Sequence, residues 1–183
     1  GLMSLGYKIN SRNPAEIDAA VARVLEWKKN IRKFDAESYK TEVASGATWL
    51  GHGYSTDATQ VIVGDEEEGL APRHDIGFAL PKEGFTIAFD EMVLSSAAPN
   101  PDLAYAFMDY VYRGDIAAEN MDYIMGPMPV KPGIEKLDPD YRKLIILPPD
   151  VIARGQVLEP VDDDPAVMEL YNKAWDRIKA TND

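Results

Sequence analysis

The sequence predicts an α/β protein with a partly parallel sheet. Short segments rich in β-branched and aromatic residues alternate along the chain with longer segments that carry apolar residues at helical spacing. Of the 183 residues, 45% are hydrophobic and 27% are charged, which is the balance of a folded globular protein. This length suits one domain or a small two-lobed unit.

The first third of the chain predicts three helices and one buried strand. Asn13 can cap a helix that starts at Pro14, and apolar residues follow at helical spacing. Residues 31–34 suggest a short strand or a connector, and residues 36–44 suggest a short helix. Ala47–Leu50 has the composition of a buried strand, and Ser55–Val63 that of a further helix.

The segment that follows predicts two strands. An acidic loop at residues 65–68 is typical of a solvated turn. Ile76–Leu80 is rich in strand-forming residues and stops at a proline. Thr86–Ser95 predicts a longer strand, interrupted by two adjacent acidic residues.

The clearest helix starts at Asn100-Pro101 and stops at Gly114. We expect Asp115 to cap the next helix, which runs to about Met125. The apolar stripe of the clearest helix consists of Leu103, Ala106, Phe107, Tyr110 and Val111.

The last third predicts two more helices around a short strand. A short helix is expected around Asp138–Leu144, and Pro148-Pro149 breaks the chain after it. Val157-Leu158 favours a short strand, and Asp164-Pro165 starts the last helix. The inward face of that helix is expected to hold Val167, Leu170, Tyr171, Ala174, Trp175 and Ile178.

Composition excludes several classes of function. Nineteen Lys and Arg against 31 Asp and Glu give a net charge of −12, which argues against nucleic acid as a partner. The absence of cysteine excludes disulfide frameworks, thiolate metal sites and cysteine nucleophiles. No stretch predicts a membrane span, and the first residues lack the pattern of a signal peptide. Because natural chains start at Met, Gly1 indicates a removed tag or a piece of a longer chain.

Catalytic motifs give little support to an enzyme. The common phosphate, nucleotide, zinc-protease and serine-hydrolase motifs are missing. The histidines are His52 and His74, and a metal site would add Asp57, Asp75 or Asp90 to them at spacings that fit no familiar ligand pattern. We therefore expect no metal and no cofactor. A metal-assisted hydrolytic enzyme that uses His52, Asp57 and Asp90 stays open as an alternative.

Trp49 and Asp90 are the strongest candidates for ligand binding. Trp49 lies in an aliphatic segment beside a glycine-rich loop, where it either packs in the core or forms an aromatic wall. Asp90 lies in an apolar segment, where a carboxylate is costly to bury without a partner. That partner is a helix N-terminus, an Arg or Lys, or a ligand cation. An aromatic face together with a carboxylate is how proteins hold organic cations.

Several segments match a known family in order and spacing. They are Leu5–Tyr7 with Arg12–Ile17, Glu42–Gly51, Pro81–Asp90, Pro99–Val111 and Tyr171–Ala180. Through these segments the chain resembles the C-terminal part of periplasmic spermidine/putrescine-binding proteins, the solute-binding subunits of ABC importers. The similarity extends over nearly all 183 residues.

The resemblance implies a periplasmic-binding-protein-like fold of type II, in which two α/β lobes flank a hinged cleft. This chain would supply the C-terminal lobe, with a mixed sheet flanked by helices, and part of the second lobe. Residues 1–87 and 135–183 would form the body of the C-terminal lobe. Residues 88–134 would form the crossing segment and a partial N-terminal-lobe portion.

The resemblance also implies capture of a small cationic solute, a polyamine, without catalysis. Trp49 would pack on the polyamine and Asp90 would pair with an ammonium group. Lobe closure would trap the ligand and present it to an ABC permease in the membrane. The implied location is periplasmic or otherwise extracytoplasmic.

Three positions depart from the family pattern. Ala88 stands where the family often has Trp, Met125–Pro129 replaces a segment that often holds Tyr, and no glutamine matches near Val161. The alternatives are a different or bulkier cationic solute, a loss of high affinity, or a ligand-free scaffold or signalling domain that retains the fold.

Members of that family are about twice as long as this chain. We therefore expect the 183-residue chain to lack an N-terminal half and to bind polyamine weakly or not at all. Because the apolar stripe of the helix after Pro101 is uncovered, we also expect the chain to dimerise, to swap elements with a copy, or to show the segment Asp102–Met125 detached from the lobe body.

Overall fold

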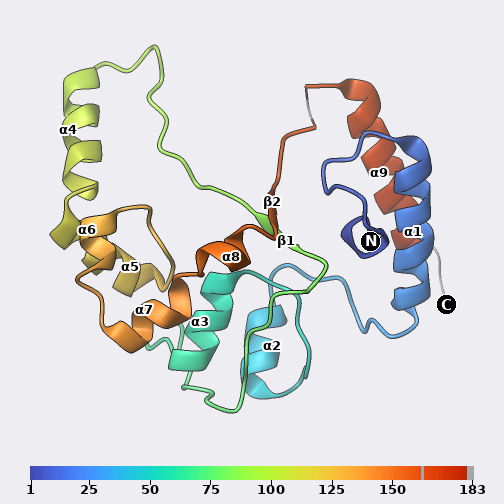
Figure 1. The fold of residues 1–183 in the computed structure, drawn as a ribbon, viewed down its shortest axis with the longest axis horizontal. Helices are drawn as coiled ribbons and strands as arrows, with labels where there is room; N and C mark the ends of the chain where they lie inside the picture. Colours follow the sequence, from blue (N-terminus) through green and yellow to red (C-terminus); the bar gives the residue numbers. More distant parts are fainter. Residues whose placement is uncertain (162, 181–183) are drawn as a thin grey trace. The chain divides into compact units, whose positions relative to one another are not determined.

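The structure is a computed structural model that describes residues 1–161 and 163–180 (Figure 1). Contacts divide the chain into two compact units. Unit 1 holds residues 1–34, 80–89 and the described part of 149–183, and unit 2 holds residues 35–79 and 90–148. In the described ranges, no helix combines the length and apolar character that a membrane crossing requires.

Unit 1 is built around two long helices and a parallel strand pair. In chain order its elements are the 3-10 helix η1 (Met3–Leu5), α1 (Pro14–Lys28), β1 (Phe85–Ile87), α8 (Pro149–Ile152), β2 (Gly155–Val157) and α9 (Pro165–Ala180).

Helices α1 and α9 pack against each other and form the core of unit 1. The Asn13 side chain accepts a hydrogen bond from Ala15 N, and Pro14 occupies the first turn, as the sequence predicts. The buried residues of this pair are Ile17 and Val21 from α1 and Ala174 and Ile178 from α9. Lys28 Nζ donates to the carbonyl oxygen of Ile178, 2.9 Å away, which favours the C-terminal end of α9.

Strands β1 and β2 form a two-stranded parallel sheet, with Phe85 opposite Gly155 and Ile87 opposite Val157. Gly84, just before β1, has φ +117°, a backbone conformation that favours glycine. A Cβ there would also lie 2.8 Å from Arg154 O. The tight approach explains the glycine at this position.

Unit 2 consists of helices and irregular segments. In chain order its helices are α2 (Tyr39–Ser45), α3 (Ser55–Val63), α4 (Pro101–Val111), α5 (Gly114–Ile124), α6 (Lys131–Ile134) and α7 (Pro139–Ile145).

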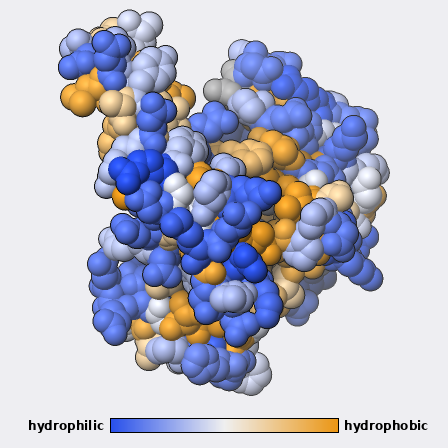
Figure 2. Space-filling view, turned by 60° about the vertical axis from the view of Figure 1, so that its left-hand side comes forward, coloured by the Kyte–Doolittle hydropathy of each residue, from blue (hydrophilic) through white to orange (hydrophobic). Residues whose placement is uncertain are grey.

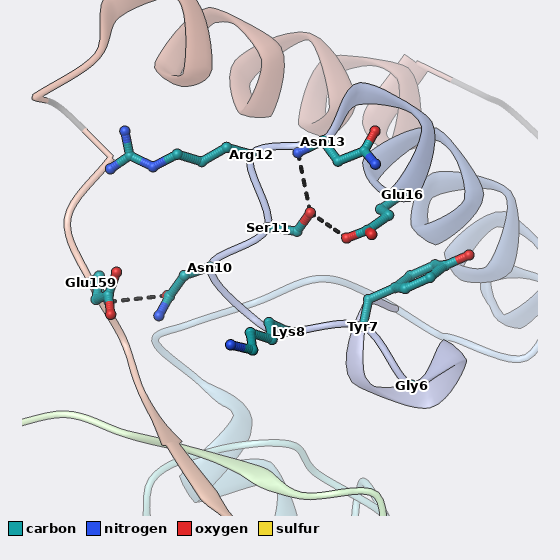
Figure 3. A pocket seen from close by; sticks show the side chains of 9 residues that line it. All are labelled: Gly6, Tyr7, Lys8, Asn10, Ser11, Arg12, Asn13, Glu16 and Glu159. Carbon is teal, nitrogen blue, oxygen red and sulfur yellow. Dashed lines mark hydrogen bonds between the residues drawn. The ribbon is translucent and has the colours of Figure 1, made fainter.

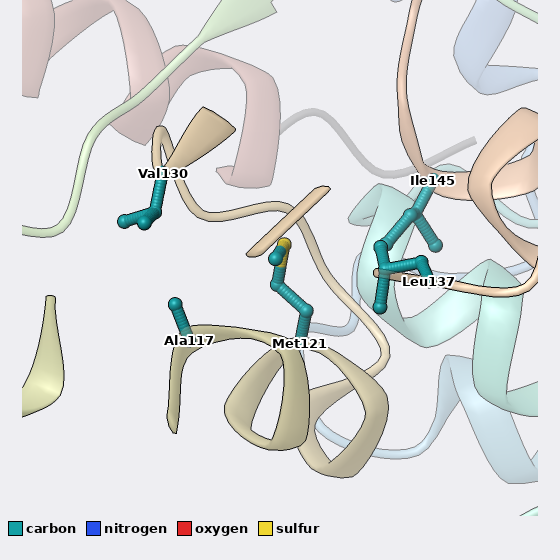
Figure 4. Close-up of a cluster of buried hydrophobic side chains, with 5 residues drawn as sticks. All are labelled: Ala117, Met121, Val130, Leu137 and Ile145. Carbon is teal, nitrogen blue, oxygen red and sulfur yellow. The ribbon is translucent and has the colours of Figure 1, made fainter. Parts of the chain in front are cut away.

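The core of unit 2 lies around α5, α6 and α7 (Figure 4). Gly133 lets α6 approach α5 closely, because a Cβ there would lie 3.0 Å from both Ala117 Cβ and Met121 Cε. The Tyr141 hydroxyl donates to the carbonyl oxygen of Met121 at 2.9 Å. The buried cluster consists of Ala117, Met121, Val130, Leu137 and Ile145.

Helix α4 differs from the other long helices because none of its residues is buried. Asn100 caps it as predicted, since its side chain accepts from Leu103 N at 3.1 Å. The predicted apolar stripe is nevertheless exposed, including Leu103 at 65%, Phe107 and Tyr110. On the face drawn in Figure 2, hydrophobic residues lie at the surface among hydrophilic ones.

The predicted α/β class is confirmed, as a helix-dominated chain with a small parallel sheet that is consistent with a partial periplasmic-binding-protein-like fold. The sheet is much smaller than the predicted mixed sheet. Thr86–Ser95 forms a strand only as far as Ile87, and Ile76–Leu80 is irregular. The part of Thr86–Ser95 after Ile87 and the segment Ile76–Leu80 have strand composition but no neighbouring strand in the described part of the chain, and a strand needs a partner.

Other predictions need smaller corrections. The segment 31–34 is a connector, and the helix predicted over 36–44 spans Tyr39–Ser45. Arg113, rather than Asp115, is the N-cap of α5, and Asp115 instead pairs with the Arg113 guanidinium at 2.7 Å. The predicted strand at Val157-Leu158 lies slightly earlier, at Gly155–Val157.

The predicted lobe body (1–87 and 135–183) and the crossing portion (88–134) refer to a complete two-lobed protein, and this assignment stays a prediction. Residues 162 and 181–183 of that body lie outside the described residues.

Candidate functional site

Trp49 is not a core residue, because 96% of its surface is exposed. The buried strand predicted over Ala47–Leu50 is therefore wrong. Helix α2 ends at Ser45, its C-cap Gly46 has φ +78°, and the chain then turns back on the helix. Thr48 holds this turn, since its N donates to Glu42 O at 3.0 Å and its Oγ1 donates to Glu42 Oε2 at 2.9 Å. The anchored turn sends the next side chain, Trp49, into solvent.

Trp49 lines a pocket of about 240 Å³ in unit 2. The other lining residues come from α2, from the turn after it and from the irregular segment that follows the acidic loop. They are Val43, Gly46, Thr48, Arg73, Asp75 and Ile76. The pocket therefore combines an indole ring with one cation and one carboxylate.

An ion pair between Arg73 and Asp75 forms one wall of this pocket. Arg73 Nε and one terminal guanidinium nitrogen each donate to a separate oxygen of Asp75, both at 2.8 Å. The hydrogen bonds from Arg73 lower the pKa of Asp75 to about 2. The remaining guanidinium nitrogen donates to the carbonyl oxygen of Ala44 near the end of α2. This geometry joins the turn before Trp49 to the segment at 73–75.

The sequence analysis named Asp75 only as a possible metal ligand together with the histidines, and it missed Arg73. The one local signal is the spacing of a cation and a carboxylate two residues apart, in Pro72-Arg73-His74-Asp75. That spacing is common on protein surfaces, so it does not distinguish a pocket wall from an ordinary exposed pair.

Asp90 is exposed in the irregular segment after β1 and is not among the residues that line the Trp49 pocket. The strand in which it was predicted does not extend to it. The placement of Trp49 and Asp90 in one concave site therefore stays a prediction.

The residues of the metal-assisted alternative do not form a ligand set. Within residues 1–161 and 163–180, no group of three or more His, Asp or Glu side chains is arranged to hold a metal ion. Asp57 instead accepts a hydrogen bond from the Tyr39 hydroxyl, which also accepts from Tyr54 N at 3.2 Å. Burial, together with the bond to Asp57, raises the pKa of Tyr39 to about 12. His52 is exposed.

A second pocket, of about 560 Å³, lies in unit 1 at the start of α1 (Figure 3). Ser11, which is buried, donates to Glu16 Oε2 at 2.5 Å and accepts from Asn13 N at 3.2 Å. Asn10 accepts from Glu159 N at 3.0 Å. The lining contains both cationic and acidic side chains, and several lining residues form hydrogen bonds with one another. Its residues are Gly6, Tyr7, Lys8, Asn10, Ser11, Arg12, Asn13, Glu16 and Glu159.

Comparison with known proteins connects this chain to solute binding. A family model described as bacterial extracellular solute-binding protein matches residues 1–149. The chain is 34% identical over 179 residues to a putrescine/cadaverine-binding protein of Pseudomonas aeruginosa. The matched region covers 97% of this chain and 50% of that protein.

Two further relatives have similar coverage. A putrescine/agmatine-binding protein of Pseudomonas aeruginosa is 28% identical over 96% of this chain and 47% of its own length. A spermidine/putrescine-binding periplasmic protein of Salmonella typhimurium is 25% identical over 98% of this chain and 49% of its own length. The chain thus spans about half the length of the relatives that it matches.

Proposed function

Since the chain belongs to the family of bacterial extracellular solute-binding proteins, we propose that it is part of the solute-binding component of an ABC importer. It binds a polyamine or a related cationic solute and delivers it to a permease in the membrane. Its location is the periplasm or an equivalent space outside the cytoplasm. The mechanism is capture and release, without a chemical step.

The observation that carries this proposal is the exposure of Trp49. Tryptophan side chains are usually well buried, and an indole ring left almost wholly in water forgoes a large hydrophobic gain. The turn that exposes it is held by the hydrogen bonds between Thr48 and Glu42, so the ring is presented by an ordered segment. Such a ring suits a ligand that covers it, and the methylene groups and charged ends of a polyamine supply both hydrophobic and cation–π contacts.

Asp90 supplies the negative charge in this proposal. An exposed carboxylate becomes a strong acceptor for an ammonium group when closure of the protein removes water from the pair. Its pairing with Trp49 rests on the matching order of the family segments, which end at Asp90 in one case and include Trp49 in another.

The names of the relatives support the class of solute. Putrescine, cadaverine and agmatine, which appear in those names, are chains of methylene groups with a cationic group at each end. One relative is named as a periplasmic protein, which supports the proposed location. The departures at Ala88 and at Met125–Pro129 leave two alternatives within this function, a different or bulkier cationic solute and a lower affinity than that of the relatives.

Calorimetric titration of the complete protein that carries these 183 residues tests the proposal. The titrants are putrescine, cadaverine, agmatine, spermidine and the monoamine pentylamine. We expect Asp90→Asn to weaken binding by about 1.5–3 kcal/mol, the scale of a hydrogen bond to a charged group. Trp49→Ala should cost roughly 0.5–2 kcal/mol in cation–π energy, plus lost contact area.

Leu50→Ala is the matched control, because Leu50 is the exposed neighbour of Trp49 and is not among the pocket residues. It should leave every affinity unchanged. Equal affinities in wild type, Trp49→Ala and Asp90→Asn for all five titrants would contradict the proposed site. A wild-type protein that binds none of them would contradict the proposed function.

A further inference from the structure

The Trp49 segment, which runs from Thr48 to Tyr54, is bonded to helix α2 at both of its ends. At the first end, Thr48 N donates to Glu42 O at 3.0 Å and Thr48 Oγ1 donates to Glu42 Oε2 at 2.9 Å. At the second end, Tyr54 N donates to the hydroxyl oxygen of Tyr39 at 3.2 Å. The chain on both sides of the exposed indole ring is therefore fixed to the same helix.

Two glycines allow the middle of the Trp49 segment to lie directly against α2. A Cβ at Gly51 would lie 2.9 Å from Val43 Cγ2, and a Cβ at Gly53 would overlap the ring of Tyr39. Close approach of the backbone to another group is a common reason for glycine in such a place. Tyr39 thus contacts the segment in two ways, through its ring at Gly53 and through its hydroxyl oxygen at the next residue.

These contacts come from one face of α2. Tyr39, Glu42 and Val43 are three and four residues apart, the spacing at which side chains share one face of a helix. All three are half-buried, in contrast to Trp49. The Tyr39 hydroxyl donates in turn to Asp57 in the first turn of α3. The contacts are local in sequence, since they join α2, the segment that follows it and the start of α3.

An ordered segment favours binding to the ring that it carries. A loop that becomes ordered only when a ligand binds loses conformational entropy at that moment, which weakens the affinity. A loop that is already held in the free protein avoids this loss. The contacts with α2 therefore have a consequence for any solute that covers the indole ring of Trp49.

We infer that Tyr39 and Glu42 are positioning residues, which hold the Trp49 segment against α2 and thereby raise the affinity for a polyamine that covers the indole ring. The inference rests on the proposed function and adds two residues to it. Neither is among the described residues that line the Trp49 pocket, so they act through the segment rather than by contact with the solute.

Calorimetric titration of the complete protein with putrescine and cadaverine tests this inference. Tyr39→Phe removes the hydroxyl group and keeps the ring. It should weaken both diamines about fivefold, the factor that corresponds to one hydrogen bond of about 1 kcal/mol. Glu42→Ala should weaken them by a similar factor. Glu42→Gln loses the charge but keeps an acceptor for Thr48, and it should retain the wild-type affinity.

A double-mutant cycle tests whether Glu42 acts through Thr48. Thr48→Val removes the hydroxyl group with little change of shape and should weaken binding as much as Glu42→Ala. The double variant should bind no more weakly than either single variant, because both remove the same hydrogen bond.

Two matched controls separate positioning from a general loss of stability. Tyr141→Phe removes a tyrosine hydroxyl that is bonded to the backbone of unit 2 at Met121 O. Thr41→Val removes a threonine hydroxyl that is bonded to Ser38 O at 3.0 Å. Both should leave the affinity for the two diamines within about twofold of wild type.

The decay of fluorescence anisotropy gives a direct readout of how firmly Trp49 is held. It is measured without ligand, in a protein in which every other tryptophan is replaced by Phe. Fast local motion of the indole ring should increase in Tyr39→Phe and in Glu42→Ala. It should stay at the wild-type level in Glu42→Gln and in both controls.

The outcomes separate this inference from the function on which it rests. Wild-type affinity in both Tyr39→Phe and Glu42→Ala would overturn the inference, while diamine binding by the wild type would leave the proposed function standing. Weaker binding without faster motion of Trp49, or an equal loss of affinity in the controls, would also overturn the inference. If the wild type binds no polyamine, the proposed function fails and the inference fails with it.

Discussion

Helices α1 and α4 have the same type of N-cap but differ in how far their residues are buried. Each starts with an Asn side chain that accepts a backbone N–H bond, followed by a proline in the first turn. Helix α1 buries Ile17, Ala20 and Val21, whereas α4 buries none of its residues. Local signals therefore specify where a helix starts, but they do not say whether its apolar face has a partner within the same chain.

This difference agrees with the coverage of the relatives. Helix α1 meets α9, which is in this chain, and their contact forms a core. Helix α4 carries an apolar stripe of the kind that packs on a sheet or on another helix, and the described part of unit 2 supplies no cover for it. The chain spans about half the length of its relatives, and we expect the partner of α4 to lie outside these residues.

The largest contrast is expected from removal of one aliphatic side chain in each helix. Ile17→Ala in α1 should lower the free energy of unfolding of unit 1 by about 2–5 kcal/mol, because Ile17 is 3% exposed in a packed core. Leu103→Ala in α4 should change stability by less than about 0.5 kcal/mol, because this side chain is largely in solvent. Urea denaturation of both variants checks the pair, and equal losses would show that α4 is packed in solution.

Self-association is the second effect that the exposed face of α4 predicts. Phe107 and Tyr110 lie on an apolar stripe with no buried residue, and such patches drive association. We expect the molar mass of the 183-residue chain to rise with concentration, and Phe107→Glu to weaken association at least about tenfold by adding a charge to the interface. Light scattering measures this. A chain that stays monomeric at every concentration would contradict the prediction.

Removal of the two N-caps should have a smaller effect on stability, and the effect should differ between the two helices. Asn13→Ala and Asn100→Ala each remove a capping bond worth about 1 kcal/mol. The loss at Asn13 should appear in the cooperative unfolding of unit 1. The loss at Asn100 should appear only as faster hydrogen exchange along α4, because that helix is not coupled to a core. If Asn100→Ala lowers the stability of unit 2 as a whole, the two helices are more alike than the structure indicates.

The last expected effect, similar in size to the loss of one N-cap, is a pH dependence in unit 2, where α4 lies but does not contribute to the core. Burial raises the pKa of Tyr141 to about 12, above the ordinary value near 10 that applies in the unfolded chain. The contribution of Tyr141 to the free energy of unfolding is therefore complete below pH 10, and it is lost as the pH rises from about 10 to 12.

Tyr141→Phe tests this pH dependence. The variant should lose about 1 kcal/mol with the bond to Met121 O and should show a weaker decline over that window. Tyr39, whose pKa is also raised to about 12, titrates in the same window and leaves a residual slope. An unchanged slope between pH 10 and 12 in Tyr141→Phe would contradict the assignment.

Sequence predicted the helices well because their signals are local. The helix over Ser55–Val63 has the predicted bounds, and Asp138 caps α7 through its side chain as a helix start would suggest. The strands were predicted poorly because a strand is completed by a neighbour that the local sequence does not specify. Ala47–Leu50 and Ile76–Leu80 have suitable composition, yet neither has a strand beside it among the described residues.

The residues of the candidate site show the same difference between local signals and contacts that only folding creates. Trp49 was singled out by its residue type and surroundings, and its exposure follows from the turn that Thr48 and Glu42 hold. Arg73 was missed because it reaches Trp49's pocket from a segment more than twenty residues further along the chain, and only the folded chain brings them together. The pairing of Asp90 with an ammonium group stays a prediction from the family segments.

Fluorescence of a protein with one tryptophan tests whether Trp49 is the ligand wall. Trp27, Trp175 and every tryptophan of the complete protein outside these 183 residues are replaced by Phe, so that emission reports only Trp49. In the free protein the emission should match that of an exposed indole. We predict that a titration with cadaverine or pentylamine shifts or quenches this emission in a saturable way, with the same midpoint as calorimetry. Saturable calorimetric binding with no change in Trp49 emission would contradict the proposed site.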